Sequence, residues 1–143
     1  MIGAYCGGVA ITASGTTAVH ALSYPLGGKY HIPHGVSNAI LFAPVMRLNR
    51  DACEARLASL CDAVYPEQAL ESDKDKSEYM IKQISHIVQL TDIPTDLSAY
   101  HVTRNDLDFL VKAGSEQKRL LNNNRKELTL EEIRSVYEEV LKD

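Results

Sequence analysis

The sequence lacks tryptophan, and its 143 residues include only two phenylalanines and three cysteines. Cys6, Cys53 and Cys61 form no Cys-x-x-Cys pair and are odd in number, which argues against both a zinc ribbon and a disulfide framework. Free thiols in a chain long enough to bury its own core indicate a cytoplasmic protein. Cys53 and Cys61 lie eight residues apart, nearly on one helical face, so we expect both thiols to fill the core.

Long apolar runs and strong charge of either sign are also missing. Glycine and threonine interrupt the apolar opening segment, so it is not expected to cross a membrane, and no basic stretch precedes it as in a secretory signal. Fifteen Lys and Arg against nineteen Asp and Glu give a net charge of −4, with the cations scattered. We therefore expect no membrane and no nucleic-acid partner, and small-molecule or protein partners instead.

The opening segment is small and apolar, with almost no charge over residues 1–23. This composition predicts a helix that is buried on most sides or packed closely against a neighbour. Pro25, Gly27 and Gly28 then predict that the helix stops and that residues 24–33 form a loop. The first part of the chain is thus expected to be one buried helix followed by a long connection.

Apolar residues at helical spacing predict the remaining elements. The predicted helices cover approximately residues 35–48, 52–64, 74–90, 103–114 and 130–141. Pro44 is expected to kink or end the first of them. Thr129 and Glu132 form a capping-box sequence that opens the last. No segment shows sustained strand alternation, so we predict an all-α helical bundle with residues 1–143 as a single domain.

Two histidines flank the glycine- and proline-rich segment between the first two predicted helices. If that segment folds back on itself, His20 and His34 can converge on one divalent cation, since imidazole binds zinc, iron and similar ions. Spacing alone leaves open the alternative of one hydrogen-bonded core histidine and one loop histidine. Two ligands also do not complete a site. His31 is expected to be exposed, and His86 and His101 to lie without partners.

The order of motifs around these histidines is distinctive. His20 precedes Pro-Leu-Gly-Gly at residues 25–28, and residues 34–41 read His-Gly-Val-Ser-Asn-Ala-Ile-Leu. This pattern resembles the signature of the iron-containing (group III) alcohol dehydrogenases, and the similarity continues to the end of the chain. The resemblance implies the helical C-terminal metal-binding domain of the dehydroquinate synthase-like, iron-dependent alcohol dehydrogenase fold. It also implies that His20 and His34 are metal ligands.

Tyr24 is a departure from this family's pattern. Many members carry another histidine at this position, four residues after the metal ligand and facing the reaction centre. A phenol can hydrogen-bond a substrate oxygen, but its usual pKa near 10 makes it a poorer proton shuttle than imidazole at neutral pH. Tyr24 is our candidate catalytic residue, and a core or rim role is the alternative.

The resemblance implies a C-terminal domain of an NAD(P)-linked alcohol dehydrogenase, in which a metal assists hydride transfer between an alcohol and an aldehyde or ketone. In the family, an aspartate, a further histidine and the nucleotide-binding domain precede the position of His20, and we expect this chain to lack them. Asp51 and Asp62 follow His34 and are not expected to replace the missing ligands.

Three expectations about function follow from this comparison with the family. The bound metal is iron or zinc, no residue of this chain binds the nicotinamide cofactor, and the chain is inactive without the N-terminal half. The alternative is a non-catalytic helical oligomerisation remnant with no bound metal. Exposed apolar surface on the first helix predicts a homo-oligomer in either case.

Overall fold

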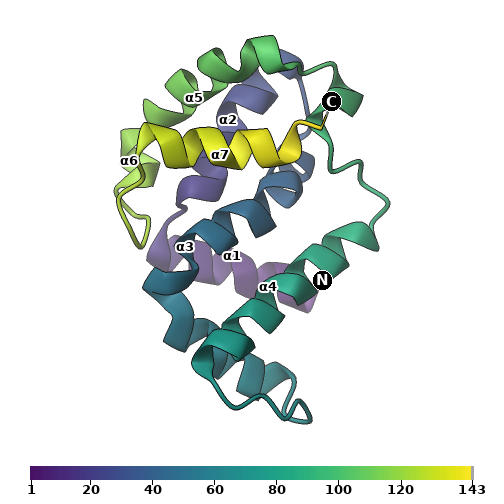
Figure 1. The fold of residues 1–143 in the computed structure, drawn as a ribbon, viewed down its shortest axis with the longest axis vertical. Coiled ribbons are helices and arrows are strands. Elements are labelled where there is room, and N and C mark those ends of the chain that lie inside the picture. Colours follow the sequence, from purple (N-terminus) through teal and green to yellow (C-terminus); the bar gives the residue numbers. More distant parts are fainter. Residues whose placement is uncertain (143) are drawn as a thin grey trace.

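A computed structural model describes residues 1–142, which form helices and loops with no strand among them (Figure 1). The helices are α1 (Ile2–Ser14), α2 (Ala18–Tyr30), α3 (His34–Val64), α4 (Asp73–Gln89), η1 (Leu97–Tyr100), η2 (Arg104–Asp106), α5 (Leu107–Ser115), α6 (Lys118–Leu121) and α7 (Leu130–Val140). The predicted all-α fold is confirmed. Within the described range, no helix has both the length and the apolar character needed to cross a membrane. The assignment of residues 1–143 to a single domain stays a prediction.

The main core lies where α2 packs against α3 and α5, and where α7 packs against α3 and α5 (Figure 1). Its fully buried side chains include Leu22, Leu26, Leu41, Leu110 and Tyr137.

The predicted capping box at the start of α7 is confirmed. The Glu132 N–H donates to Thr129 Oγ1 at 3.1 Å, and the Thr129 N–H donates to Glu132 Oε2 at 2.9 Å. From this capped start, the C-terminal helix packs against α3 and α5.

The second half of α3 packs against α4 around a smaller core of Leu57, Cys61, Met80 and Ile81. Cys61 is buried, so the prediction that it fills the core is confirmed, whereas Cys53 is only half-buried at the edge of the same cluster.

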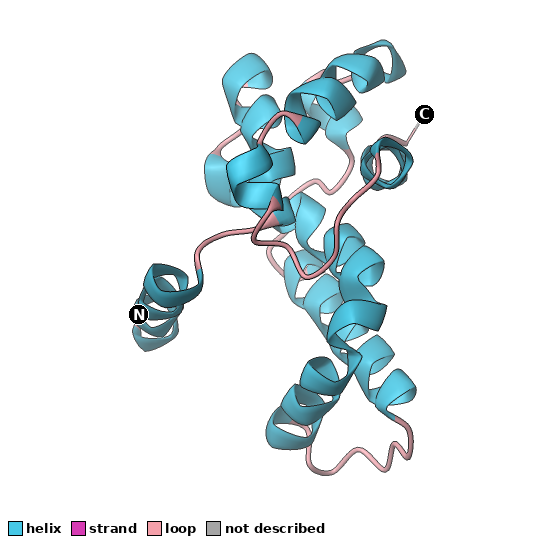
Figure 2. Ribbon diagram, turned by 90° about the vertical axis from the view of Figure 1, so that its left-hand side faces the viewer, coloured by secondary structure: helices cyan, strands magenta, loops and turns pink. Residues whose placement is uncertain are grey.

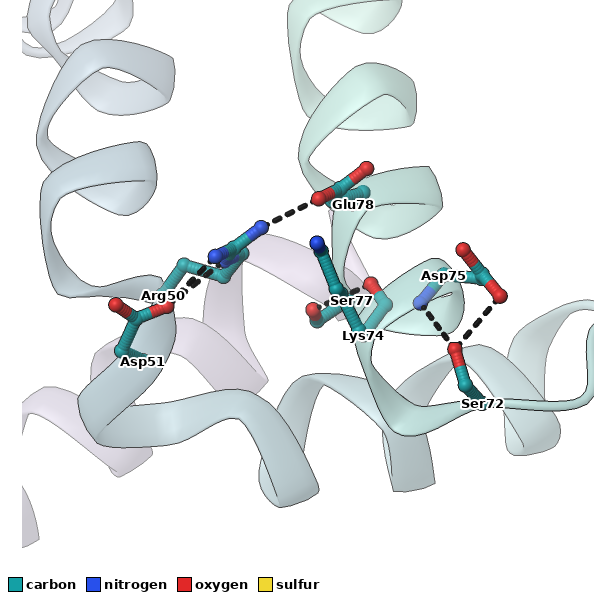
Figure 3. Close-up of polar contacts among 7 residues, drawn as sticks. All are labelled: Arg50, Asp51, Ser72, Lys74, Asp75, Ser77 and Glu78. Carbon is teal, nitrogen blue, oxygen red and sulfur yellow. Dashed lines mark hydrogen bonds and ion pairs between the residues drawn. The ribbon is translucent and has the colours of Figure 1, made fainter.

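Helix α3 joins the two helices predicted at residues 35–48 and 52–64. Pro44 is buried inside the helix and does not end it, whereas the backbone departs from helical geometry at Cys53, with φ −136° and ψ 18°. Figure 3 shows how α4 is held beside this bend: Arg50 of α3 pairs with Glu78 of α4 and also contacts Asp51 at 2.7 Å. The break thus lies nine residues after the proline, where an ion pair to a neighbouring helix supports it.

At the start of α4, Ser72 is the N-cap and accepts a hydrogen bond from the Asp75 N–H at 3.0 Å (Figure 3). Acidic residues in the first turn, Asp73 and Asp75, also suit the partial positive charge at a helix N-terminus. The predicted helix over residues 74–90 therefore matches α4 to within one residue at each end.

The prediction of one buried helix over residues 1–23 is wrong. Gly15, at φ 71°, breaks the segment into α1 and α2, and every residue of α1 is exposed. Figure 2 shows α1 standing apart from the other helices. The apolar composition favours burial on all sides, but no other part of the described chain covers this helix. Only α2, from Ala18 onwards, enters the core.

The prediction of a loop over residues 24–33 is also wrong. Helix α2 continues through Pro25, Gly27 and Gly28 to Tyr30, and the next residue, the C-cap His31, adopts the left-handed conformation at φ 55°. Pro25 and its neighbour Leu26 are buried, so core packing outweighs the helix bond that the proline cannot make. The connection to α3 is therefore only three residues long. It turns back along α2, where the Ile32 N–H donates to the Leu26 carbonyl at 3.4 Å.

Candidate metal centre

The two histidines predicted as metal ligands lie together. His20 is in the first turn of α2 and His34 is the first residue of α3. Their ring centroids are 5.1 Å apart, with ring planes inclined by 58°. The turn after His31 makes this approach possible, because it brings the start of α3 back towards the start of α2. The structure thus gives the convergence that sequence spacing could only suggest.

Asn38 joins the two rings. It lies one helical turn after His34 on α3, and its Nδ2 is 3.0 Å from His34 Nε2 and 3.4 Å from His20 Nε2. In this orientation the amide –NH₂ group donates to both Nε2 atoms, an arrangement that requires each ring to carry its proton on Nδ1. Both Nε2 atoms therefore lie within 3.4 Å of the same amide group. The Asn38 Oδ1 atom is buried and has no hydrogen-bond partner among the described residues.

The surroundings of His20 favour its neutral form. The pKa of His20 is lowered, first by burial of the ring and then by the charge that His34 can carry. Neutral imidazole is the form that binds a metal ion, because the ring must offer a free lone pair. The lowered pKa therefore favours the form of His20 that can bind a metal ion.

Tyr24 lies one turn after His20 on α2, with its ring centroid 6.1 Å from that of His34 and the ring planes inclined by 42°. Its side chain is 42% exposed, which places it at the rim of the site and not in the core. A groove of about 400 Å³ opens beside His20. It is lined by Ile11, Val19, His20, Asn38 and Phe42, among others.

The other candidate residues do not join this cluster. His31, His86 and His101 are exposed. Asp62 forms an ion pair with Lys76 at 2.8 Å, and Asp51 pairs with Arg50.

Within residues 1–142 no group of three or more His, Cys, Asp or Glu side chains could hold a metal ion. The chain therefore offers two imidazole ligands, which is half of an ordinary tetrahedral set. Asn38 was not anticipated from the sequence, although its place four residues after His34 puts both side chains on one helical face.

Comparisons of this chain with known proteins all point to the same family. The C-terminal model of the Fe-containing alcohol dehydrogenase family matches residues 1–141. Long-chain-alcohol dehydrogenase 1 of Geobacillus thermodenitrificans is 35% identical over 136 residues, which cover 95% of this chain and 34% of that protein. Lactaldehyde reductase of Escherichia coli K12 is 28% identical over 136 residues, covering 95% of this chain and 35% of the relative.

A solved alcohol dehydrogenase from Oenococcus oeni has the same fold, with a TM-score of 0.83 and 25% identity. The match covers 93% of this chain and 34% of that protein. This chain spans about a third of the length of the relatives that it matches. It belongs to the Fe-containing alcohol dehydrogenase family and corresponds to the C-terminal part of that family's proteins.

Proposed function

We propose that this chain is the metal-binding domain of an iron-dependent, NAD(P)-linked alcohol dehydrogenase. The observation that carries the proposal is the approach of the His20 and His34 rings, whose Nε2 atoms both lie within 3.4 Å of the Asn38 amide, next to an open groove lined by His20. The proposed reaction is reversible hydride transfer between a small alcohol and its aldehyde or ketone. Several relatives bear dehydrogenase or reductase names, which agrees with this class of chemistry.

In this proposal His20 and His34 hold a divalent cation, iron or zinc, through Nε2. A cation held there would polarise the alcohol oxygen and lower the pKa of its hydroxyl. The apolar side chains of Val19 and Phe42 line the groove next to His20 and suit the hydrocarbon part of an alcohol. Tyr24, at the exposed rim, is the residue that would hydrogen-bond the substrate oxygen.

The remaining parts of the reaction are proposed to come from outside this chain. The described residues contain no strand, so they offer no doubly wound sheet of the kind that binds a dinucleotide. Two imidazoles also leave half of the coordination sphere to other ligands. We therefore propose that the chain alone is inactive and that NAD(P) and the other metal ligands belong to an N-terminal half.

Helix α1 is the proposed contact surface for that half. All thirteen of its residues are exposed, none is charged, and Ile11 in its last turn lines the same groove as His20. Large exposed apolar surfaces mark interaction sites. The exposed helix also favours a second candidate function, in which copies of this chain pair through α1 and form a non-catalytic helical oligomer without metal.

Complementation tests the two functions against each other. The chain is mixed with the separately expressed N-terminal two thirds of the Geobacillus relative, together with Fe²⁺ or Zn²⁺, NAD⁺ or NADP⁺ and a series of alcohols. The proposal predicts reduced cofactor only in the mixture, and its loss with His20→Ala or His34→Ala. No activity in any mixture, with a stable homo-oligomer by light scattering that is broken by Ile2→Asp and Val9→Asp, would favour the oligomerisation module.

A further inference from the structure

We propose that Asn38 is a positioning residue for the metal site, because its side-chain amide holds the His20 and His34 rings in the tautomer that leaves both Nε2 atoms without a proton. This role rests on the proposed metal site, since a ring nitrogen must offer a free lone pair to bind a cation. Asn38 itself makes no bond to the ion. It fixes both rings in the metal-free chain, and the ion then takes over their lone pairs.

The amide of Asn38 contacts both rings at once. Its Nδ2 atom lies 3.0 Å from His34 Nε2, an ordinary hydrogen-bond distance, and 3.4 Å from His20 Nε2, which indicates a weaker bond. Asn38 lies one turn after His34 on α3, and α3 packs against α2, which carries His20. A single amide group therefore connects the proposed ligands of two different helices.

The hydrogen-bonding capacity of the amide favours the orientation with Nδ2 towards the rings. In this orientation both N–H bonds have acceptors, and the buried Oδ1 atom alone lacks a partner among the described residues. A half-turn about χ2 would instead leave two N–H donors to be satisfied where one oxygen now needs a partner. Among backbone groups, buried N–H donors without a partner are rarer than carbonyl oxygens without one. The amide is therefore expected to donate to the rings and not to accept from them.

A donor on the Nε2 side decides the tautomer of each ring. Neutral imidazole carries its proton on either Nδ1 or Nε2, and the hydrogen bonds of the ring set which. Two N–H groups directed at the Nε2 atoms hold the protons of both rings on Nδ1. Water can both donate and accept, so it selects neither tautomer, and His34 is exposed. Without Asn38, nothing at the Nε2 side of the exposed ring would keep that nitrogen free of a proton.

Metal binding must also change the contacts of the amide. The lone pair on an Nε2 atom cannot serve the amide and a cation at the same time. Binding of an ion to His20 and His34 therefore breaks both hydrogen bonds of the Asn38 amide. The side-chain –NH₂ group of Asn38 is thus expected to report metal binding, although it is not a ligand.

Asn38→Ala and Asn38→Asp test this role in the whole, metal-free chain. Long-range ¹H–¹⁵N NMR of the imidazole rings shows which nitrogen carries the proton, at a pH of about 9, where imidazoles are neutral. The wild type should have its proton on Nδ1 in both His20 and His34. Asn38→Ala should give a mixture of tautomers. Asn38→Asp should move the protons to Nε2, because a carboxylate only accepts.

Asn122→Ala is the matched control, because Asn122 is exposed at the end of α6, and it should have the wild-type tautomers. The ring signals of His86, which is exposed on α4, should be the same in every variant. Circular dichroism checks that the helices are intact. A loss of stability alone does not move ring protons, so the tautomers separate a positioning role from a merely structural one.

Two results for the metal-free chain would overturn the proposed role of Asn38. One is a proton on Nε2 of both rings in the wild type, which would mean that the amide accepts from them. The other is the wild-type pattern of tautomers in Asn38→Ala. The wild-type spectrum alone can give the first result, so the test does not depend on the folding of a variant.

Titration of the wild type with Zn²⁺ separates this role from the proposed function. The side-chain –NH₂ signals of Asn38 should shift as the ion binds, whereas those of Asn122 should not. Zinc binding with unchanged Asn38 signals would contradict the positioning role and leave the metal site intact. A wild type that binds no zinc would contradict the proposed function, whereas the tautomers of the metal-free chain would still decide what Asn38 does to the two rings.

Discussion

The hydroxyl of Tyr137 donates a 2.7 Å hydrogen bond to the backbone carbonyl of Leu22, and both residues are fully buried. Leu22 lies on α2 between His20 and Tyr24, so this bond fixes the candidate site from the C-terminal helix. The same turn of α2 contains Pro25, which has no N–H to donate to the Ala21 carbonyl. The contact from α7 therefore holds α2 where the helix's own hydrogen bonding is interrupted.

Replacing Tyr137 with phenylalanine removes this bond and keeps the ring. We expect the free energy of unfolding to fall by about 1 kcal/mol, the usual net contribution of a hydrogen bond between uncharged groups. Urea unfolding followed by circular dichroism measures it. Tyr100→Phe is the control, because its hydroxyl contacts the Pro94 carbonyl at 3.4 Å from a half-buried position and should contribute little. Equal stability of Tyr137→Phe and the wild type would contradict this account.

The Tyr137 hydroxyl also predicts a pH dependence. Burial raises the pKa of this phenol well above its usual value near 10. A raised folded-state pKa gives stability that is complete below about pH 10 and is lost as pH rises, because the unfolded chain ionises first.

Comparing the wild type with Tyr137→Phe isolates this effect, since the other tyrosines are common to both chains. The stability advantage of the wild type should be constant from pH 7 to about 9.5 and should shrink above about pH 10. Urea unfolding at each pH gives the difference. An advantage that grows with rising pH would show that the sign is wrong.

We predict that the packing around Gly114 on α5 leaves no room for a side chain. A Cβ atom there would lie 2.8 Å from Leu22 Cδ2 and 3.0 Å from the Tyr137 hydroxyl. Overpacking of this kind costs about 1–3 kcal/mol, which exceeds the gain of up to about 1 kcal/mol in helix propensity. We therefore expect Gly114→Ala to lower the melting temperature.

Gly28→Ala is the matched substitution, because Gly28 is also helical and has nothing within 4 Å of an added Cβ. It should leave stability unchanged or raise it by up to about 1 kcal/mol. Thermal unfolding of both variants gives the comparison. The packing argument would be wrong if the two substitutions had the same effect.

The capping box of α7 gives a fourth prediction. Thr129→Ala removes the oxygen that accepts from the Glu132 N–H and should lower the free energy of unfolding by about 1 kcal/mol. Thr129→Ser keeps that oxygen and should restore most of the loss. Urea unfolding separates the two variants. Similar destabilisation by serine and alanine would indicate that the Thr129 methyl group, and not the cap, matters.

Local signals explain which elements the sequence predicted correctly. The capping box at Thr129 and Glu132 and the helical spacing of α4 depend on residues close together in the chain, and the structure agrees with both. The loop predicted around Pro25 and Gly27 failed because the tertiary burial of Pro25 and Leu26 outweighs local helix-breaking tendencies. Burial of α1 could not be judged either, since composition does not say whether a partner surface is present.

For the candidate site too, some features could be predicted from the sequence and others could not. His20 and His34 were chosen from a resemblance to a family, and the structure brings them together, but metal binding by them stays a prediction. Asn38 was missed because it stands out only once both histidines are seen to face its amide. Tyr24 lies near the pair, and its catalytic role also stays a prediction.

The metal content of the purified chain tests the central claim most directly. The wild type, His20→Ala and His34→Ala are loaded with Zn²⁺ or Fe²⁺, desalted and measured by elemental analysis, with affinities from calorimetry. His86→Ala is the control, since His86 is exposed on α4 and outside the site. We predict one ion per chain in the wild type and in His86→Ala, and none in the other two variants. A wild type that binds no ion, or equal binding by all four chains, would contradict the claim that His20 and His34 form a metal site.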